Sequence, residues 1–167
     1  MWDISQFLHF YAIIYDISQI KGERTMICTF FGHRDAPDYI YQSLKATIID
    51  LINKGVIEFY VGNDGNYDRT AQKVLVDIIN QGYKINLTVI LSRIDERAFF
   101  ASEYQTLFPE ELEKALPRFA ISKRNEWMIK NADVVITYVK HKFSNSYNWQ
   151  EKARKKGLQI IYLADKI

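Results

Sequence analysis

From Met26 onward, short apolar runs alternate with segments of helical periodicity. The runs are rich in β-branched and aromatic residues and lie at 26–31, 56–61, 85–91, 133–139 and 158–163. Between several of them, apolar residues recur every three or four positions and a glycine follows, which is typical of a helix that ends there. Strands that are apolar throughout are buried on both faces. The pattern therefore predicts an α/β fold with a parallel sheet and helices on both faces.

Right-handed connections between parallel strands limit how such a chain can be wound. They predict a three-layer, Rossmann-like sheet of about five strands in the order 3-2-1-4-5. In sheets of this kind, ligands bind beyond the carboxyl ends of the strands, where the strand order reverses. Here the reversal falls between the first and fourth strands, so residues that follow these strands are the candidates for a binding site.

Composition narrows the class of protein. The chain has 167 residues, enough for one domain with a substantial core, and its formal net charge is only +2 with Lys and Arg spread along it. No electrostatic argument for nucleic acid arises, so we do not expect nucleic acid as a partner. The single cysteine, Cys28, lies in a predicted strand and excludes a disulfide framework. We expect a reducing, cytoplasmic location.

Residues 1–25 precede the alternating pattern. Their opening, "MWDISQFLHFYAIIYDISQI", lacks a cationic start and a small-residue cleavage site and contains Asp3 and Asp16, which argues against a signal peptide. It is also too short and too interrupted to cross a membrane. "KGERTM" can be encoded by a purine-rich stretch resembling a bacterial ribosome-binding site. We therefore expect residues 1–25 to be an upstream extension, with a domain at 26–167 and Met26 as the natural start. Mass spectrometry showing a native chain that begins at Met1 would contradict this.

Two expected strand ends carry residues suited to an anion. Gly32, His33 and Arg34 follow the first strand. After the second, "GNDGNYDRTA" places Gly62, Asn63 and Gly65 before a helix, whose N-terminus favours negative charge. Asp68 in the first helical turn either caps the helix or accepts a hydrogen bond from a ligand. The loop has neither a dinucleotide-binding nor a P-loop glycine pattern.

Later segments add further candidates. Arg118 and Arg124, in the irregular stretch between the third and fourth strands, suit a phosphate or carboxylate, or are solvated surface residues. His141 follows the fourth strand and should lie near His33. Two histidines without a third ligand make a poor metal site, so we expect no metal and assign His33 to a hydrogen bond with a polar ligand. No arrangement for nucleophilic catalysis emerges.

Four stretches in register carry a resemblance: "FFGHRDAP", "EFYVGNDGNYDRTA", "LPRFAISKRNEWMIKNADVVITYV" and "EKARKKGLQIIYL". From Met26 to the C-terminus, the chain resembles the YpsA/YoqJ-like family of the SLOG superfamily, which is related to the DNA-processing Smf/DprA proteins and to LOG-type enzymes. The resemblance implies a Rossmann-like domain that binds a nucleotide or a nucleotide-derived ligand. It nominates as ligand-binding residues Gly32, His33, Arg34, Gly62, Gly65, Asp68, Arg118, Arg124 and Asn125.

One departure from the family concerns the turn after the fourth strand. Relatives usually have a Gly-Gly pair there, whereas this chain has Ser144 and Asn145, whose side chains restrict the approach of a ligand to the backbone. Glu151 falls at the offset of the catalytic glutamate of LOG-type enzymes. Because the surrounding glycines and threonine are missing, we interpret Glu151 as a solvent-facing helix residue. Glu151 and Asp68 stay weak catalytic candidates.

Three functions follow from these residues. The first is binding or sensing of a nucleotide-like ligand, with Arg34, Arg124 and the amides of the glycine loop on its phosphate and Asp68 or Asn125 on its sugar or base. The second is hydrolysis of the N-glycosidic bond of a nucleotide, and the third is handling of single-stranded DNA. We expect no other cofactor and no membrane partner. Two interpretations of Tyr147 and Trp149 stay open, packing over the sheet or contact with a partner such as a second copy of the chain.

Overall fold

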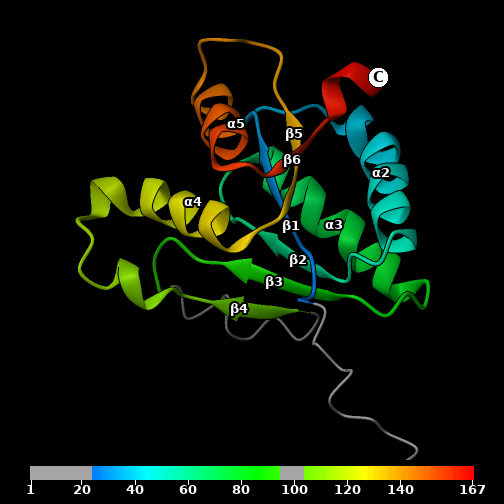
Figure 1. The fold of residues 1–167 in the computed structure, drawn as a ribbon, viewed down its shortest axis with the longest axis horizontal. Helices are drawn as coiled ribbons and strands as arrows, with labels where there is room; N and C mark the ends of the chain where they lie inside the picture. The colour runs from blue at the N-terminus through cyan, green and yellow to red at the C-terminus, as the bar shows by residue number, and fades with distance from the viewer. Residues whose placement is uncertain (1–23, 95–103) are drawn as a thin grey trace, which may run out of the picture.

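The computed structural model describes residues 24–94 and 104–167 (Figure 1). In these ranges one sheet has six parallel strands in the order β4-β3-β2-β1-β5-β6. The strands are β1 (Ile27–Gly32), β2 (Glu58–Val61), β3 (Asn86–Ile90), β4 (Gln105–Leu107), β5 (Val134–Tyr138) and β6 (Gln159–Tyr162). The helices are α2 (Tyr41–Asn53), α3 (Asn66–Asn80), α4 (Ala120–Asn131) and α5 (Asn145–Lys156). The proposed extension lies almost wholly outside the described residues.

The five strands expected from the sequence are all present and adjacent in the expected order. The sheet has one strand more than the five identified from the sequence, because β4 pairs with β3 at its edge. In the described part of the chain, four 3-10 turns connect or end the larger elements: η1 (Asp38–Ile40), η3 (Glu110–Leu112), η4 (Pro117–Phe119) and η5 (Leu163–Lys166). Helix α4 begins at Ala120, directly after η4.

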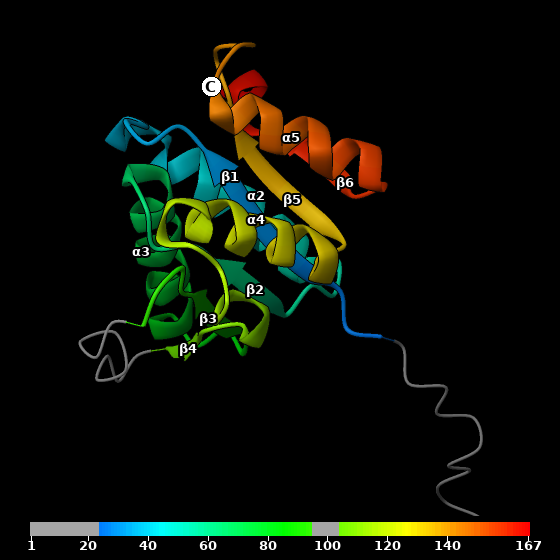
Figure 2. The ribbon, with the colours of Figure 1, turned by 90° about the vertical axis from the view of Figure 1, so that its left-hand side faces the viewer.

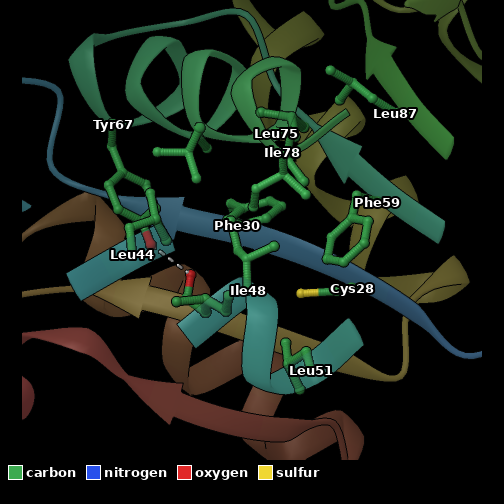
Figure 3. Packing of buried hydrophobic residues seen from close by; sticks show 14 of the residues in the cluster. Cys28, Phe30, Leu44, Ile48, Leu51, Phe59, Tyr67, Leu75, Ile78 and Leu87 are labelled. Atoms are coloured by element: carbon green, nitrogen blue, oxygen red, sulfur yellow. Dashed lines mark hydrogen bonds between the residues drawn. The ribbon is translucent and has the colours of Figure 1, made fainter. Parts of the chain in front are cut away.

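Helices α2 and α3 cover one face of the sheet, and α4 and α5 cover the other (Figures 1 and 2). On the α2–α3 side, Leu44, Ile48 and Leu75 pack against alternate residues of β1 and β5, among them Phe30 (Figure 3). The buried Tyr67 also packs there and donates a hydrogen bond from its hydroxyl to the Ile136 carbonyl, 3.1 Å away. This face holds the larger hydrophobic cluster and fixes the start of α3 against β5.

Cys28 lies in this cluster, fully buried (Figure 3). Burial raises the pKa of its thiol far above the ordinary value, because the interior disfavours the thiolate. The thiol therefore acts as a small apolar side chain. None of the helices within residues 24–94 and 104–167 combines the length and the apolar character needed to cross a membrane.

The opposite face carries a smaller cluster. Phe31, Met128 and Val135 are buried between the sheet and helices α4 and α5. Trp149 of α5 packs partly buried against Phe31, with 6.2 Å between the ring centroids and an interplanar angle of 26°. Packing over the sheet is therefore the interpretation of Trp149 that the structure supports. Phe31 and Trp149 together cover this face of the sheet near the ends of β1 and β5.

Candidate functional site

A pocket of about 840 Å³ lies at the carboxyl ends of β1 and β5. These two strands pair in parallel over the full length of β5, from Val134 to Tyr138, and the strand order reverses between them. Segments from four parts of the chain line the pocket: the end of β1 with its loop, the β2–α3 region, α4 with the turn before it, and α5. The pocket therefore lies at the position that the strand order predicted.

Most residues nominated from the sequence line this pocket, namely Gly32, His33, Arg34, Asp68, Arg118, Arg124, Asn125, Ser144 and Asn145, and so does Glu151. Gly62, Asn63 and Gly65 do not line it, but each contacts a residue that does. Sequence reasoning missed Asp64, Ser146, Trp149, Lys152 and Lys155, which also line the pocket. The run of polar and charged residues in the first turns of α5 was the available signal for several of these.

Two amides in the region between β2 and the start of α3 are engaged within the protein. The Asp64 amide donates to the Asp68 carboxylate at 2.9 Å, and the Asn66 amide donates to the Arg34 carbonyl at 2.7 Å. These two donors are satisfied within the protein, whereas a contribution of the Gly62, Asn63 and Gly65 amides to phosphate binding stays a prediction. The loop holds Asp68 and the backbone of Arg34 in place.

Gly65 brings this loop against the loop after β1. It has a φ of +92° and a ψ of 174°, a backbone conformation that is almost confined to glycine. A Cβ atom at this position would lie 2.9 Å from the Arg34 Cα. Gly65 thus permits close contact between the two loops.

Arg124 lies buried in a cluster of oxygen atoms. Its side chain is only 4% exposed, and Nη1 lies 3.0 Å from Asp64 Oδ2 and 3.1 Å from Asn63 Oδ1. Nη2 lies 3.8 Å from the Asp68 carboxylate, and both Nε and Nη2 donate to Asn125 Oδ1. The expectation that Arg124 holds a phosphate is not met in this geometry, because its donors are engaged by carboxylates and amides of the protein.

Asp68 shares this environment and faces the pocket from α3. It is 7% exposed, and burial raises the pKa of its carboxyl from 3.8 to about 6, against the lowering effects of Arg124 and of the Asp64 amide. A Cβ atom on Gly62 would lie 2.4 Å from Asp68 Oδ2, so a side chain there would displace the carboxylate. Asp68 thus orders the loop rather than capping the helix.

The raised pKa of Asp68 makes stability depend on pH. The pKa of Asp68 is about 6 in the folded protein and 3.8 in the unfolded chain. Between pH 3.8 and pH 6 the folded protein therefore keeps a proton on this carboxyl that the unfolded chain has lost. The free energy of unfolding should therefore fall by up to about 3 kcal/mol from this group as pH rises from about 4 to about 6. Denaturant unfolding across this range should show the fall, and Asp68→Asn should flatten it. A carboxyl that titrates near pH 4 by NMR would contradict the expectation.

His33 lies at the rim of the pocket beside β5. Its Nε2 accepts a hydrogen bond from the Lys140 amide at 2.8 Å, which places the proton of the neutral ring on Nδ1. Burial and the neighbouring His141, with ring centroids 5.3 Å apart, lower the pKa of His33. Neutral His33 is therefore a hydrogen-bond donor at the rim near pH 7. Residues 24–94 and 104–167 contain no group of three His, Cys, Asp or Glu side chains arranged for a metal ion.

The N-terminus of α5 also lines the pocket, through Ser144, Asn145 and Ser146. Ser144 adopts an ordinary extended backbone and caps the helix, its hydroxyl accepting from the Tyr147 amide at 3.1 Å. Ser146 donates from its hydroxyl to the Gly32 carbonyl at 2.7 Å. Within the described residues, the Asn145 and Ser146 amides have no acceptor. These amides form the end of a helix that favours an anion.

Charged side chains complete the pocket. Arg34 and Arg118 are exposed and line it, as do Lys152 and Lys155 of α5. Glu151 also lines it, but its carboxylate is paired with Arg154, whose Nη2 lies 2.8 Å from Oε2, and this pair lowers the pKa of Glu151. The accessible charge of the pocket is therefore mainly positive, whereas its carboxylates are engaged.

Comparison with solved structures identifies a protein with a similar fold. A solved structure of DNA processing protein A (DprA) from Streptococcus pneumoniae superposes with a TM-score of 0.62 at 14% identity, over 83% of this chain and 50% of that chain. The two proteins share a fold. This chain spans about half the length of DprA, and at such low identity the likeness concerns the arrangement of strands and helices alone. Neither a scan of protein families nor a search of curated proteins found a match.

Proposed function

We propose that the chain binds a small phosphate-bearing ligand of the nucleotide type in the pocket at the ends of β1 and β5. The observation that carries the proposal is the pocket itself, about 840 Å³ at the reversal of strand order, with the first amides of α5 on one wall and cationic side chains around it. The resemblance to the YpsA/YoqJ-like family supports the same ligand class.

In this proposal the phosphate lies at the start of α5. The Asn145 and Ser146 amides donate to it, the helix dipole adds to the attraction, and Arg34 contributes a charged donor from the opposite loop. Asn125 and Asp68, which also line the pocket, suit hydroxyl or amino groups of the sugar or base. Arg124 has a positioning role, since it holds Asn63, Asp64 and Asn125.

Replacement of Arg34 by glutamine should weaken AMP binding by about tenfold, because a hydrogen bond from a charged donor is lost. Arg69→Gln is the matched control, since Arg69 is an exposed arginine of α3 that does not line the pocket. Isothermal titration calorimetry of the wild type and both variants measures the difference. Absence of AMP binding by the wild type at millimolar concentration, or equal losses in the two variants, would contradict the proposal.

Hydrolysis of the N-glycosidic bond is a second use of such a pocket. LOG-like chemistry would place Glu151 at the reacting sugar, but here Glu151 is paired with Arg154. We therefore expect binding without turnover. Chromatography of AMP incubated with the protein should show no free adenine, whereas release that disappears in Glu151→Gln would favour the hydrolase.

Single-stranded DNA handling is the other candidate, favoured by the shared fold with a DNA processing protein. Exposed cations at the pocket, among them Arg118 and Lys155, would then contact successive phosphates. Fluorescence anisotropy with a labelled oligothymidine distinguishes the two. Tight binding that strengthens steeply as salt is lowered and resists competition by AMP would favour DNA over a small ligand.

A further inference from the structure

Aromatic residues line part of the pocket and have no role in the proposed phosphate contacts. Its apolar lining consists of Phe31, Ile121 and Trp149, and the Phe31 and Trp149 rings pack against each other. Of these, Trp149 has the largest planar surface and is only partly buried. An accessible indole in a polar pocket is a surface on which a planar ring can stack.

Trp149 is held in a fixed orientation from one side. Phe31 packs against it at 6.2 Å between centroids with the rings 26° from parallel, and Phe31 is itself buried in the sheet. An indole supported by a rigid neighbour loses little freedom when a ligand stacks on it.

The side chain of Lys152 lies over the Trp149 indole. The Lys152 ammonium lies 4.2 Å from the Trp149 ring centroid, and the Lys152 side chain is 55% exposed. The only other partner of this ammonium in the described residues is Glu126, 3.9 Å away and itself half exposed. Such exposed contacts of a long side chain are weak, so a ligand ring can displace the ammonium without breaking a buried interaction.

The distance along α5 fits a nucleotide. Trp149 lies four residues after Asn145, which is about 6 Å along the helix axis. In a nucleoside monophosphate, a ribose separates the 5′-phosphate from the base by a similar span. A phosphate on the first amides of α5 therefore leaves the base beside Trp149.

We infer that Trp149 is the specificity-determining residue of this pocket, stacking on the heteroaromatic base of a nucleoside monophosphate while Lys152 moves aside. The inference rests on the proposed function and deepens it, because it separates a nucleotide from a sugar phosphate that lacks a base. It assigns to the Trp149 side chain the preference for a ligand that carries an aromatic base.

The test compares AMP with ribose 5-phosphate, which differ only in the base. The wild type should bind AMP about tenfold or more tightly than ribose 5-phosphate, as base–aromatic stacking provides. Trp149→Leu should reduce AMP affinity to near that of ribose 5-phosphate and leave ribose 5-phosphate affinity unchanged. AMP should also quench the tryptophan fluorescence of the wild type and of Trp127→Phe, but not that of Trp149→Leu.

Three outcomes would overturn the inference. Equal affinity of the wild type for AMP and ribose 5-phosphate would refute stacking while leaving phosphate binding intact. A preference for AMP that survives in Trp149→Leu would place the base elsewhere. Failure of both ligands to bind would refute the proposed function and the inference together. Trp149→Phe keeps an aromatic ring against Phe31, so it should retain part of the preference and controls for loss of packing in the leucine variant.

Discussion

Arg124→Met should lower the free energy of unfolding by about 3 kcal/mol near pH 7. The variant removes the buried cation from a cluster in which Asp64 lies 3.0 Å and Asp68 3.8 Å from the guanidinium. Methionine fills much of the volume but leaves the buried Asp68 carboxylate without its opposite charge. Urea denaturation monitored by circular dichroism measures the change.

A control variant separates the effect of losing this buried charge from the general effect of replacing an arginine. Arg118→Met is the matched control, because Arg118 is exposed and should cost less than about 1 kcal/mol. The loss in Arg124→Met should also shrink near pH 5, where the Asp68 carboxyl, with a pKa of about 6, is already protonated. A loss that is independent of pH, or equal to that of the control, would show that the charge pairing is not its source.

Gly65→Ala should lower the free energy of unfolding by about 2–3 kcal/mol and also weaken binding of ribose 5-phosphate. The backbone conformation of Gly65 alone costs an alanine on the order of 1–3 kcal/mol. In addition, the new Cβ would lie 2.9 Å from the Arg34 Cα, so the loop that presents Arg34 to the pocket must shift. Thermal unfolding and calorimetric titration measure the two effects.

Gly157→Ala provides the comparison for Gly65. Gly157 ends α5 with a φ of +90°, but no atom lies within 4 Å of its potential Cβ. This variant should cost about 1 kcal/mol from backbone strain and leave ligand affinity unchanged. If both alanine variants bind ribose 5-phosphate equally well, the contact between Gly65 and Arg34 does not position the binding loop.

Much of the sheet follows from the sequence because its strands are apolar and buried. β1 and β5 carry long hydrophobic runs, and the five predicted strands take the predicted order. β4 escaped prediction for a physical reason. It has three residues, is partly exposed, and is followed closely by Pro109, so its strand character comes from pairing with β3 rather than from its own pattern.

The site was predictable in position but not in its internal pairing. The strand order placed Gly32, His33 and Arg34 at the rim, where the structure has them. Periodicity does not say which charges meet across long stretches of chain, so the pairing of Arg124 with Asp64, sixty residues earlier, had no local signal. Trp149 was recognised as an aromatic residue of α5, but its place in the pocket depends on the packing of Phe31 beneath it.

The loop after β1 is anchored from both sides. On one side the Asn66 amide binds the Arg34 carbonyl, and on the other the Lys140 amide binds the His33 ring. A rim held in this way is preorganised, so a ligand loses little affinity to the conformational entropy of ordering it. Association should then require no large rearrangement of this backbone, and the loop should show similar amide hydrogen-exchange protection in the free and ligand-bound protein.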